Sequence, residues 1–290
     1  MKRIIIFFLI IIVLLNGCSS EPAPQIAATT LPVHEFTARL CEGTGITVTR
    51  LVTEEVSCLH DYSLNVRQVK AAEAAELIII SGAGLEEFME DLLLDRSCVD
   101  ASAGIGLLCP TEAHDHGHEG HDHHHESDPH IWLSPVHAKT MVCNIAEGLA
   151  EHYPSHADQF FANKERLLFD LDTLQTYGEN ALSNLSCREM ITFHDGFAYF
   201  AEAFGLTILE AVEEESGSEA SARELIHLIE AVEHHRLPAI FTEKSGSVSA
   251  AGIIARETGC GNFPLDMAMA GDSYFEAMYH NIDTIREALQ

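Results

Sequence analysis

The chain has 290 residues, of which 47% are hydrophobic and 21% charged, so it can build packed cores and is not of the disordered class. With 45 Asp and Glu against 16 Lys and Arg, the formal net charge is −29, which repels nucleic acid and excludes it as a partner. The 18 His outnumber Lys and Arg together. Because imidazole is the commonest metal-ligating side chain, this excess favours metal binding.

The N-terminus has the pattern of a bacterial lipoprotein signal. A basic start precedes Ile4–Leu15, an unbroken apolar run that is too short for the roughly 20 residues of a membrane span. The run ends in Leu15-Asn16-Gly17-Cys18, which resembles a lipobox. We predict a signal peptide over residues 1–17, lipidation of Cys18 and a tether over 18–25. An extracytoplasmic protein held by this lipid anchor at the bacterial cell membrane follows; an uncleaved anchor or ordinary secretion is the alternative.

The first half of the chain alternates extended and helical patterns, which is typical of a parallel sheet flanked by helices. The predicted strands are Ile26–Thr30, Thr47–Val52 and Leu77–Ile80, and the predicted helices are Val33–Cys41, Leu64–Ala75 and Leu85–Leu94. We assign residues 26–153 to an N-terminal lobe of the α/β class.

A segment rich in His interrupts this lobe. Residues His114–His125 hold seven His in twelve positions, interleaved with Asp, Glu and Gly, and lack apolar periodicity. We predict a loop that binds divalent metal weakly and exchangeably, acting as a metal reservoir or a sensor. Its auxiliary ligands would be His114, His116, His118, His121, His123, His124 and His125. A solvated loop without a role is the alternative.

A long helical pattern separates the two halves. Residues 154–185 contain no Gly until Gly178, and their apolar positions recur at helical spacing. We predict one linking helix here and a second α/β lobe over residues 186–290. Its predicted strands are Met190–Phe193, Thr207–Val212, Ala239–Thr242 and Asn262–Asp266, and its predicted helices are Tyr199–Phe204, Ser221–His234 and Ser249–Thr258.

Seven cysteines follow Cys18, and no CxxC pair occurs among them. Export permits disulfides, but an odd number leaves at least one free thiol. Cys187 and Cys260 each precede a predicted strand and could bridge neighbouring strands. The sequence leaves the pairing open.

Three His outside the loop lie where a strand gives way to the next element: His60, His130 and His194. Ligands of open parallel sheets bind at the carboxyl ends of strands, so these side chains are candidate metal ligands. Zinc prefers four ligands, and Asp266, at the end of the last predicted strand, is the fourth candidate. Glu243, at the end of the preceding strand, is the rival carboxylate. The expected site is a cleft between the lobes.

Several segments resemble the metal-binding lipoproteins of ATP-driven zinc and manganese importers, the cluster A-I or ZnuA-like solute-binding family. The most diagnostic is Asp128-Pro129-His130-Ile131-Trp132-Leu133-Ser134-Pro135 after the His-rich loop; others are His60-Asp61-Tyr62-Ser63, His194-Asp195-Gly196-Phe197 and Leu265-Asp266. The resemblance implies two lobes joined by a rigid helix, with a metal held by His60, His130, His194 and Asp266. It also implies a monomer that works with an ABC-type membrane permease. One departure is Met267-Ala268, where the family commonly has Pro and a small turn.

The donor set favours Zn²⁺ as the transported ligand. Three imidazoles and one carboxylate form a nitrogen-rich site, whereas Mn²⁺ prefers more oxygen donors and manganese-type relatives typically have Glu at the position of His194. A manganese-binding homologue, a surface adhesin or a zinc buffer remain alternatives. A secreted metallohydrolase is the enzyme alternative, but no HExxH, GxSxG or GxxxxGK[ST] motif is present. We therefore predict a binding protein and not an enzyme.

Overall fold

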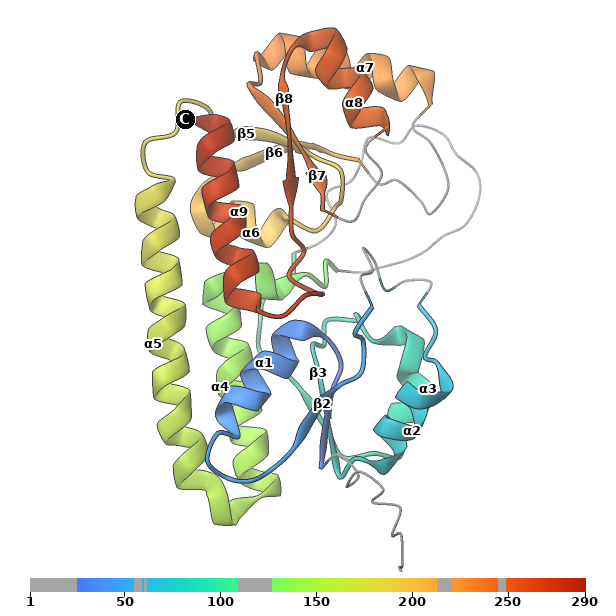
Figure 1. Cartoon of the computed structure of the whole chain (residues 1–290), viewed down its shortest axis with the longest axis vertical. Helices are drawn as coiled ribbons and strands as arrows, with labels where there is room; N and C mark the ends of the chain where they lie inside the picture. The colour runs from blue at the N-terminus through green and yellow to red at the C-terminus, as the bar shows by residue number, and fades with distance from the viewer. Residues whose placement is uncertain (1–24, 55–58, 60–61, 109–126, 213–220, 245–248) are drawn as a thin grey trace, which may run out of the picture.

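The computed structural model describes residues 25–54, 59, 62–108, 127–212, 221–244 and 249–290. These residues form two lobes stacked along the long axis, each built on a four-stranded parallel sheet (Figure 1). The predicted fold class is thereby confirmed.

The N-lobe is the sheet with strand order β2-β1-β3-β4 and the helices around it. Its strands are β1 (Ile26–Ala28), β2 (Val48–Arg50), β3 (Leu77–Ile80) and β4 (Cys98–Asp100), of which β4 was not predicted. The helices are α1 (Leu31–Leu40), α2 (Val66–Ala74) and α3 (Glu90–Leu93), with a 3-10 turn at Glu87–Met89 that shortens the helix expected over 85–94. Asn65 and Gln68 form a reciprocal capping box that fixes where α2 begins.

The C-lobe repeats this design with strand order β6-β5-β7-β8. Its strands are β5 (Glu189–Thr192), β6 (Thr207–Ala211), β7 (Ala239–Glu243) and β8 (Gly261–Leu265). Its helices are α6 (Ala198–Phe204), α7 (Ala222–His235), α8 (Ser249–Thr258) and α9 (Tyr274–Leu289), and only α9 lacked a sequence prediction. Each predicted strand of this lobe lies within one residue of the observed bounds.

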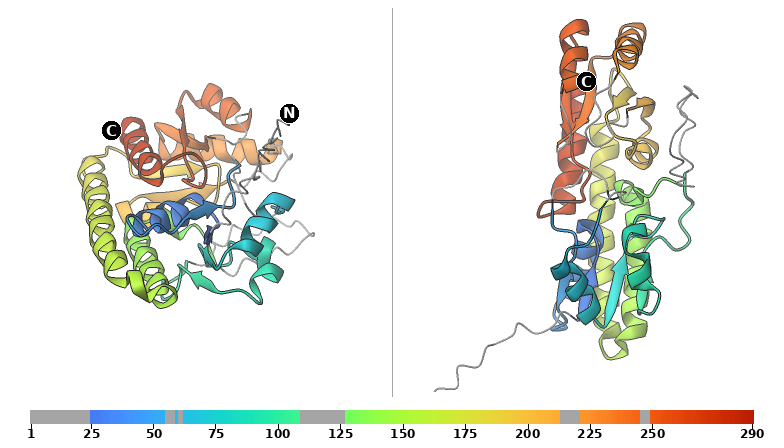
Figure 2. Two further views of the ribbon diagram at one scale, coloured as in Figure 1. Left: turned by 60° about the horizontal axis from the view of Figure 1, so that its bottom comes forward. Right: turned by 90° about the vertical axis from the view of Figure 1, so that its right-hand side faces the viewer.

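Two long helices run beside the lobes. A 3-10 turn at Ile131–Leu133 leads into α4 (Pro135–His152), and a second turn at Pro154–His156 leads into α5 (Ala157–Ala181). Helix α5 runs along one side of the molecule from the N-lobe to the C-lobe and is the predicted linking helix (Figures 1 and 2). Helix α4, which packs along α5, was not predicted. Among the described helices, none is long and apolar enough to cross a membrane.

A continuous apolar core extends from one lobe into the other. It includes residues of both sheets and of α1, α4, α5 and α9, and its largest fully buried side chains include Trp132, Tyr199 and Tyr274. Because close-packed interiors transmit displacement and resist shear, the two lobes are held in a defined relative position.

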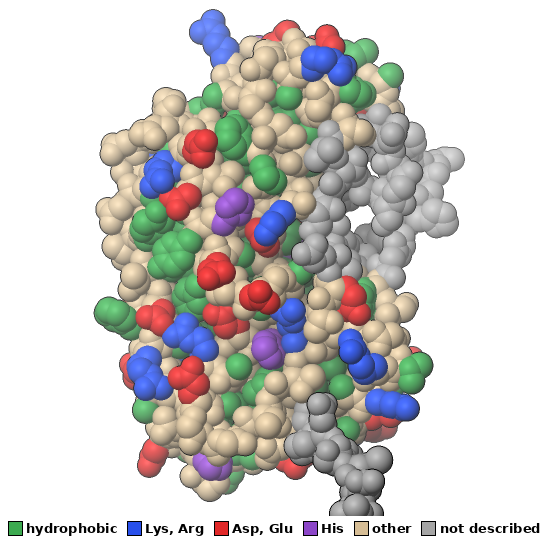
Figure 3. Space-filling model, viewed as in Figure 1, with side chains coloured by type: hydrophobic (Ala, Val, Ile, Leu, Met, Phe, Trp, Pro, Cys, Tyr) green, Lys and Arg blue, Asp and Glu red, His purple; other side chains and the backbone are tan. Residues whose placement is uncertain are grey.

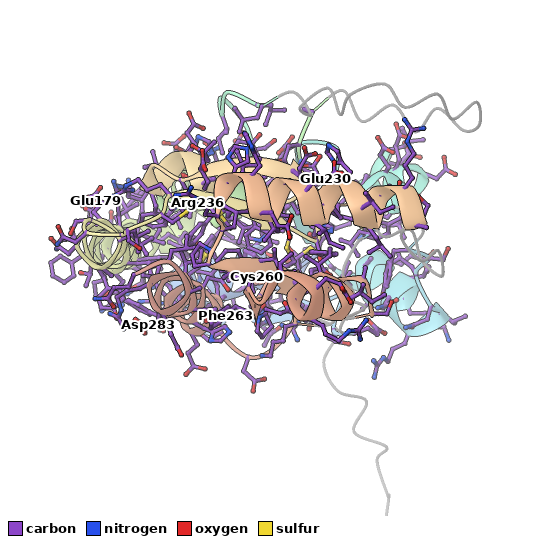
Figure 4. All side chains as sticks on the ribbon, turned by 90° about the horizontal axis from the view of Figure 1, so that it is seen from above. Glu179, Glu230, Arg236, Cys260, Phe263 and Asp283 are labelled. Carbon is purple, nitrogen blue, oxygen red and sulfur yellow. The ribbon has the colours of Figure 1, made fainter. Side chains whose placement is uncertain are left out.

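The disulfide suggested between Cys187 and Cys260 is not formed. Both are free thiols, as are Cys41, Cys98 and Cys143. Cys187 precedes β5 and Cys260 precedes β8, and β7 lies between these strands in the sheet. Figure 4, which looks onto the C-lobe from its outer end, labels Cys260, just before the edge strand β8, and Phe263 within that strand. A sequence pattern that places Cys before two strands does not reveal that a third strand separates them.

Candidate metal centre

His130 lies in the short segment that connects to α4, and its ring is held in one orientation. The Asp128 carboxylate accepts two hydrogen bonds through Oδ1, from the backbone N–H of His130 at 2.9 Å and from its ring Nδ1 at 2.8 Å. With Nδ1 engaged, Nε2 is the ring nitrogen left to face a ligand. A carboxylate on the far nitrogen is the usual partner of a metal-ligating His, because it fixes the tautomer and raises the basicity of the ligand atom.

Burial sets the charge state of this ring. The His130 residue is 5% exposed. Desolvation lowers the pKa of His130 below its ordinary value, although the hydrogen bond with Asp128 opposes the shift. A neutral imidazole is the form that ligates metals, so the protein holds His130 ready for a cation.

His194 follows β5 and meets His130 from the other lobe. The two Nε2 atoms are 3.2 Å apart, and the ring planes lie at 85° to one another with centroids 5.0 Å apart. In a tetrahedral zinc site with Zn–N bonds of about 2.0–2.1 Å, two ligand nitrogens are separated by about 3.3–3.4 Å. The observed spacing therefore fits two ligands of a single ion.

Glu243 contacts the other nitrogen of His194. The Oε1 atom of Glu243, a residue 5% exposed, lies 3.0 Å from His194 Nδ1. This distance is within the range of an ion pair. Among the described residues, none donates a well-aligned hydrogen bond to Glu243 Oε1. The strand register explains the approach, since Thr192 pairs with Phe241 and two further residues bring His194 beside Glu243. Glu243 thus faces the ring nitrogen that points away from His130.

Asp266 follows β8 and is held by its neighbours. Its backbone N–H donates to the Asn281 side chain at 2.7 Å, and the Asn281 amide donates back to the Asp266 carbonyl at 2.7 Å. Asp266 Oδ1 accepts from the Ala268 N–H at 2.8 Å, and Oδ2 lies 3.4 Å from Lys244 Nζ. Ala268 has a φ of +55°, in the left-handed region that usually favours Gly. The turn after Asp266 thus forms here with Met267 and Ala268 and contains neither Pro nor Gly.

Gly196 permits the close approach of these groups. A Cβ atom at this position would lie 2.7 Å from His194 Cδ2, 3.1 Å from His130 Cγ and 2.5 Å from Met267 Cε. The residue after Asp266 therefore packs against the same point at which the two imidazoles meet. Only Gly leaves room at this position. The sequence motif contains this Gly, but the steric reason for it is visible only in the structure.

The remaining predicted site residues, which include the lipidation site as well as metal ligands, lie outside the described residues. His60 belongs to this group, as do Cys18 and the whole His-rich loop. Leu59, just before His60, is 3% exposed and packs in the main core, and Tyr62 N–H donates to its carbonyl at 3.1 Å. Within the part of the chain that the structure describes, no cluster of three or more His, Cys, Asp or Glu side chains is arranged to hold a metal.

Sequence reasoning missed three residues of this centre. Asp128 and Trp132 were quoted in a motif but given no role, and Lys244 was not considered. The spacing Asp-Pro-His was a usable signal, because an Asp two residues before a His can accept the backbone N–H of that His. The roles of Trp132 and Lys244 depend on contacts between distant segments.

One face of the molecule carries charges of both signs. Although the net charge is −29, Lys and Arg side chains lie among Asp and Glu on the face that carries α1, α5 and α9 (Figure 3). On this face Lys and Arg side chains therefore have acidic side chains as close neighbours, despite the negative net charge of the chain.

Two lobes built on parallel sheets, with one imidazole from each side of their junction, have the arrangement of a two-lobed solute-binding protein. The family model described as ZnuA, zinc-uptake complex component A periplasmic, matches residues 26–288, and the chain belongs to this family. The resemblance inferred from the motifs is thereby confirmed.

Individual relatives agree with this assignment. The chain is 27% identical to the zinc-binding protein AdcA of Streptococcus pyogenes serotype M3 over 92% of this chain, and 28% identical to the zinc-binding lipoprotein AdcA of Streptococcus pneumoniae strain R6 over 94%. It spans 56% and 58% of those two relatives. A crystal structure of ZnuA superposes with a TM-score of 0.78 at 29% identity, covering 92% of this chain and 99% of the other.

Proposed function

We propose that this protein is an extracytoplasmic solute-binding protein that captures Zn²⁺ between its lobes and delivers it to an ABC importer. The observation that carries the proposal is the 3.2 Å separation of His130 Nε2 and His194 Nε2 across the lobe junction. His60 and the Asp266 carboxylate would complete four ligands. Asp266 is the better carboxylate candidate, because Glu243 faces Nδ1 of His194 and so lies on the other side of that ring.

The donor set supports zinc as the transported ion. Neutral imidazole suits zinc, copper and nickel, whereas manganese selects oxygen donors. His194 is an imidazole at the position that would distinguish the two kinds of relative. The AdcA relatives are named for zinc binding, and a ZnuA structure with zinc bound aligns at 29% identity with a TM-score of 0.76.

The buried carboxylates have a defined part in this mechanism. Asp128 and Glu243 each approach the Nδ1 atom of a ligand His and would hold its Nε2 lone pair toward the ion. Each carboxylate also stabilises the partial positive charge that an imidazole acquires when it donates electrons to a divalent cation. Binding and release need no covalent chemistry, so the protein would act as a carrier and not as an enzyme.

The location and organisation of the protein are part of the same proposal. Residues 1–17 would be removed, Cys18 would carry the lipid anchor, and 18–25 would tether a monomeric two-lobed domain to the membrane. The lobes would comprise residues 26–153 and 186–290, joined by 154–185. The name of the pneumococcal relative as a lipoprotein supports the anchor. The family description, a component of a zinc-uptake complex, supports a permease partner.

A competition titration tests zinc capture. Protein lacking residues 1–20 is titrated with zinc against a chromophoric chelator, and one tight equivalent is expected. His130→Ala and His194→Ala should abolish that equivalent. His152→Ala is the matched control, because it removes an exposed His at the far end of α4, about 25 Å along the helix from Pro135. Tight binding retained in both site variants would refute the proposed centre.

A further inference from the structure

Lys244 lies beside the candidate ligand Asp266 because of the strand register. Glu243 of β7 pairs with Leu265 of β8. The residues that follow them, Lys244 and Asp266, therefore lie side by side. The Lys244 N–H donates to the Leu265 carbonyl at 2.8 Å, which continues the ladder. Alternate residues of a strand point to opposite sides. Glu243 is therefore directed inward to His194, whereas the Lys244 side chain is 65% exposed and pairs with Asp266.

The Lys244 ammonium meets the one oxygen of Asp266 that its own turn leaves free. Asp266 Oδ1 is engaged by the Ala268 N–H, and the Asp266 backbone is fixed on both sides by Asn281. Oδ2 lies 3.4 Å from Lys244 Nζ. Oδ2 is thus the carboxylate oxygen that these contacts leave for a cation, and a cationic side chain of the protein already lies beside it.

We propose that Lys244 is an internal competitor of zinc. Its ammonium neutralises Asp266 while the site is empty, must leave Oδ2 when zinc binds, and recaptures the carboxylate as zinc departs. An ammonium has three donors and no acceptor, so it cannot ligate a metal and acts only in opposition to it. Lys244 would thereby weaken zinc affinity and accelerate release to the importer. This inference rests on the proposed function, since it assigns Asp266 as a zinc ligand.

The size of the effect follows from exposure. Solvent-exposed ion pairs change equilibria by roughly two- to fivefold, and salt screens them. Lys244 therefore cannot prevent binding, but it can tune the affinity and the dissociation rate. A carrier that must surrender its cargo gains from such a residue, because it lowers the barrier to release without removing a ligand.

The test compares two charge-neutralising variants. Lys244→Gln should bind zinc roughly two- to fivefold more tightly than the unaltered protein, with slower transfer of zinc to excess chelator in stopped flow. Lys139→Gln is the matched control: it removes the same charge and an ion pair with Asp172 on the α4–α5 face, and should change neither quantity. Lys244→Arg keeps the charge and should stay close to the unaltered protein. Unchanged or weaker zinc binding by Lys244→Gln would overturn the proposal.

A second comparison separates competition for Asp266 from a general field effect. In an Asp266→Asn background, Lys244→Gln should give much less gain than it does alone, because the contested carboxylate is gone. An equal gain in both backgrounds would also overturn the proposal. If the unaltered protein binds no tight zinc, the proposed function fails. If it binds one equivalent and Lys244→Gln has no effect, only the inference about Lys244 fails.

Discussion

The indole Nε1–H of Trp132 donates a 2.8 Å hydrogen bond to the main-chain carbonyl of Met267, 135 residues away in the sequence. Trp132 is fully buried two residues after His130, and Met267 directly follows Asp266. The Tyr274 hydroxyl donates to the Trp132 carbonyl at 2.8 Å. The loop between β8 and α9 is therefore fastened at both ends to the segment that bears His130, so two candidate ligands from different lobes share one support.

Replacing Trp132 with Phe tests this support. The variant leaves the buried Met267 carbonyl without its donor and creates a small cavity. We expect a loss of about 1–3 kcal/mol in the free energy of unfolding and weaker zinc binding, because the Asp266 loop loses its anchor. Denaturant unfolding followed by circular dichroism, together with the chelator titration, measures both.

Tyr177→Phe is the control for the Trp132 variant. It removes a hydroxyl that donates to Asp283 at 2.7 Å on the α5–α9 side of the molecule. Zinc affinity should not change in this control. If Trp132→Phe lost stability while binding zinc as tightly as before, the support for Asp266 would have to come from elsewhere.

Glu243 offers a test of the carboxylate that faces His194. Glu243→Gln retains the shape of the side chain but removes the charge near Nδ1, and we expect zinc affinity to fall about tenfold, with a larger loss for Glu243→Ala. Glu179→Gln removes an exposed carboxylate on α5, labelled in Figure 4, and should have no effect. An unaltered zinc Kd in Glu243→Gln would show that His194 needs no partner for its ligand orientation.

Gly196→Ala and Gly252→Ala form a matched pair. At Gly196 a methyl group would lie 2.7 Å from His194 Cδ2, so the imidazole must move and zinc affinity should fall at least tenfold. At Gly252, within α8, a methyl group meets nothing within 4 Å, and Ala should raise stability by about 0.5–1 kcal/mol through helix propensity. Calorimetric zinc titration and thermal unfolding of both variants distinguish the two effects. Equal zinc affinities would mean that the centre can absorb the methyl group.

Helices and strands were predicted correctly where the local hydrophobic pattern matches the burial of the element in the fold. The strands of the C-lobe lie between clear breaks, and α5 has apolar positions at helical spacing across 25 residues. Helix α4 carried equivalent signals that the prediction passed over: Ser134 caps it, Pro135 occupies its first turn, and its buried side chains recur three or four residues apart. Strand β4 offered no such pattern, because its three residues are exposed or half-buried at a sheet edge.

Candidate ligands could be named from the sequence, and they remain predictions, but their arrangement could not be derived from it. His194 follows from the rule that ligands gather where strands end, because it lies just after β5. His130 does not fit that rule, since it directly precedes a 3-10 turn and does not come directly after a described strand. That Glu243 faces His194, and that Lys244 meets Asp266, depends on the registers of β5 with β7 and of β7 with β8. The register of parallel strands is set by side-chain packing across the whole lobe, so it cannot be read from the local pattern of a single sequence.

The His-rich loop is predicted to bind additional zinc weakly, apart from the tight centre. Deleting His114–His125 should leave the one tight zinc equivalent and lower the number of weak equivalents, because the proposed tight centre takes its donors from His60, His130, His194 and Asp266 and none from this segment. A variant with the seven His replaced by Ser keeps the length of the loop and isolates the contribution of the imidazoles. Loss of the tight equivalent in either variant would mean that the loop contributes to the centre itself.

A buried carboxylate in the N-lobe predicts how stability depends on pH. Glu86 is 4% exposed and accepts hydrogen bonds from the Thr29 hydroxyl at 2.6 Å and from the backbone N–H groups of Ser81 and Gly82 at 2.8 and 3.0 Å. Burial outweighs these donors and raises the pKa of Glu86 from 4.5 to about 7. Since the Thr29 hydroxyl can turn to accept a proton from Oε1, the neutral acid also fits the site.

The sign of the dependence follows from this raised pKa. Between pH 4.5 and about 7 the folded protein holds a proton that the unfolded chain has released, so stability falls as pH rises through this window. The loss amounts to at most about 3 kcal/mol. Glu86→Gln should be less stable at pH 5, because its amide cannot accept from all three donors, but its stability should vary less between pH 5 and 7.5. Urea unfolding of the metal-free proteins across this range gives both slopes. If the slopes are the same, Glu86 does not titrate in the folded protein and its carboxylate is ionised throughout.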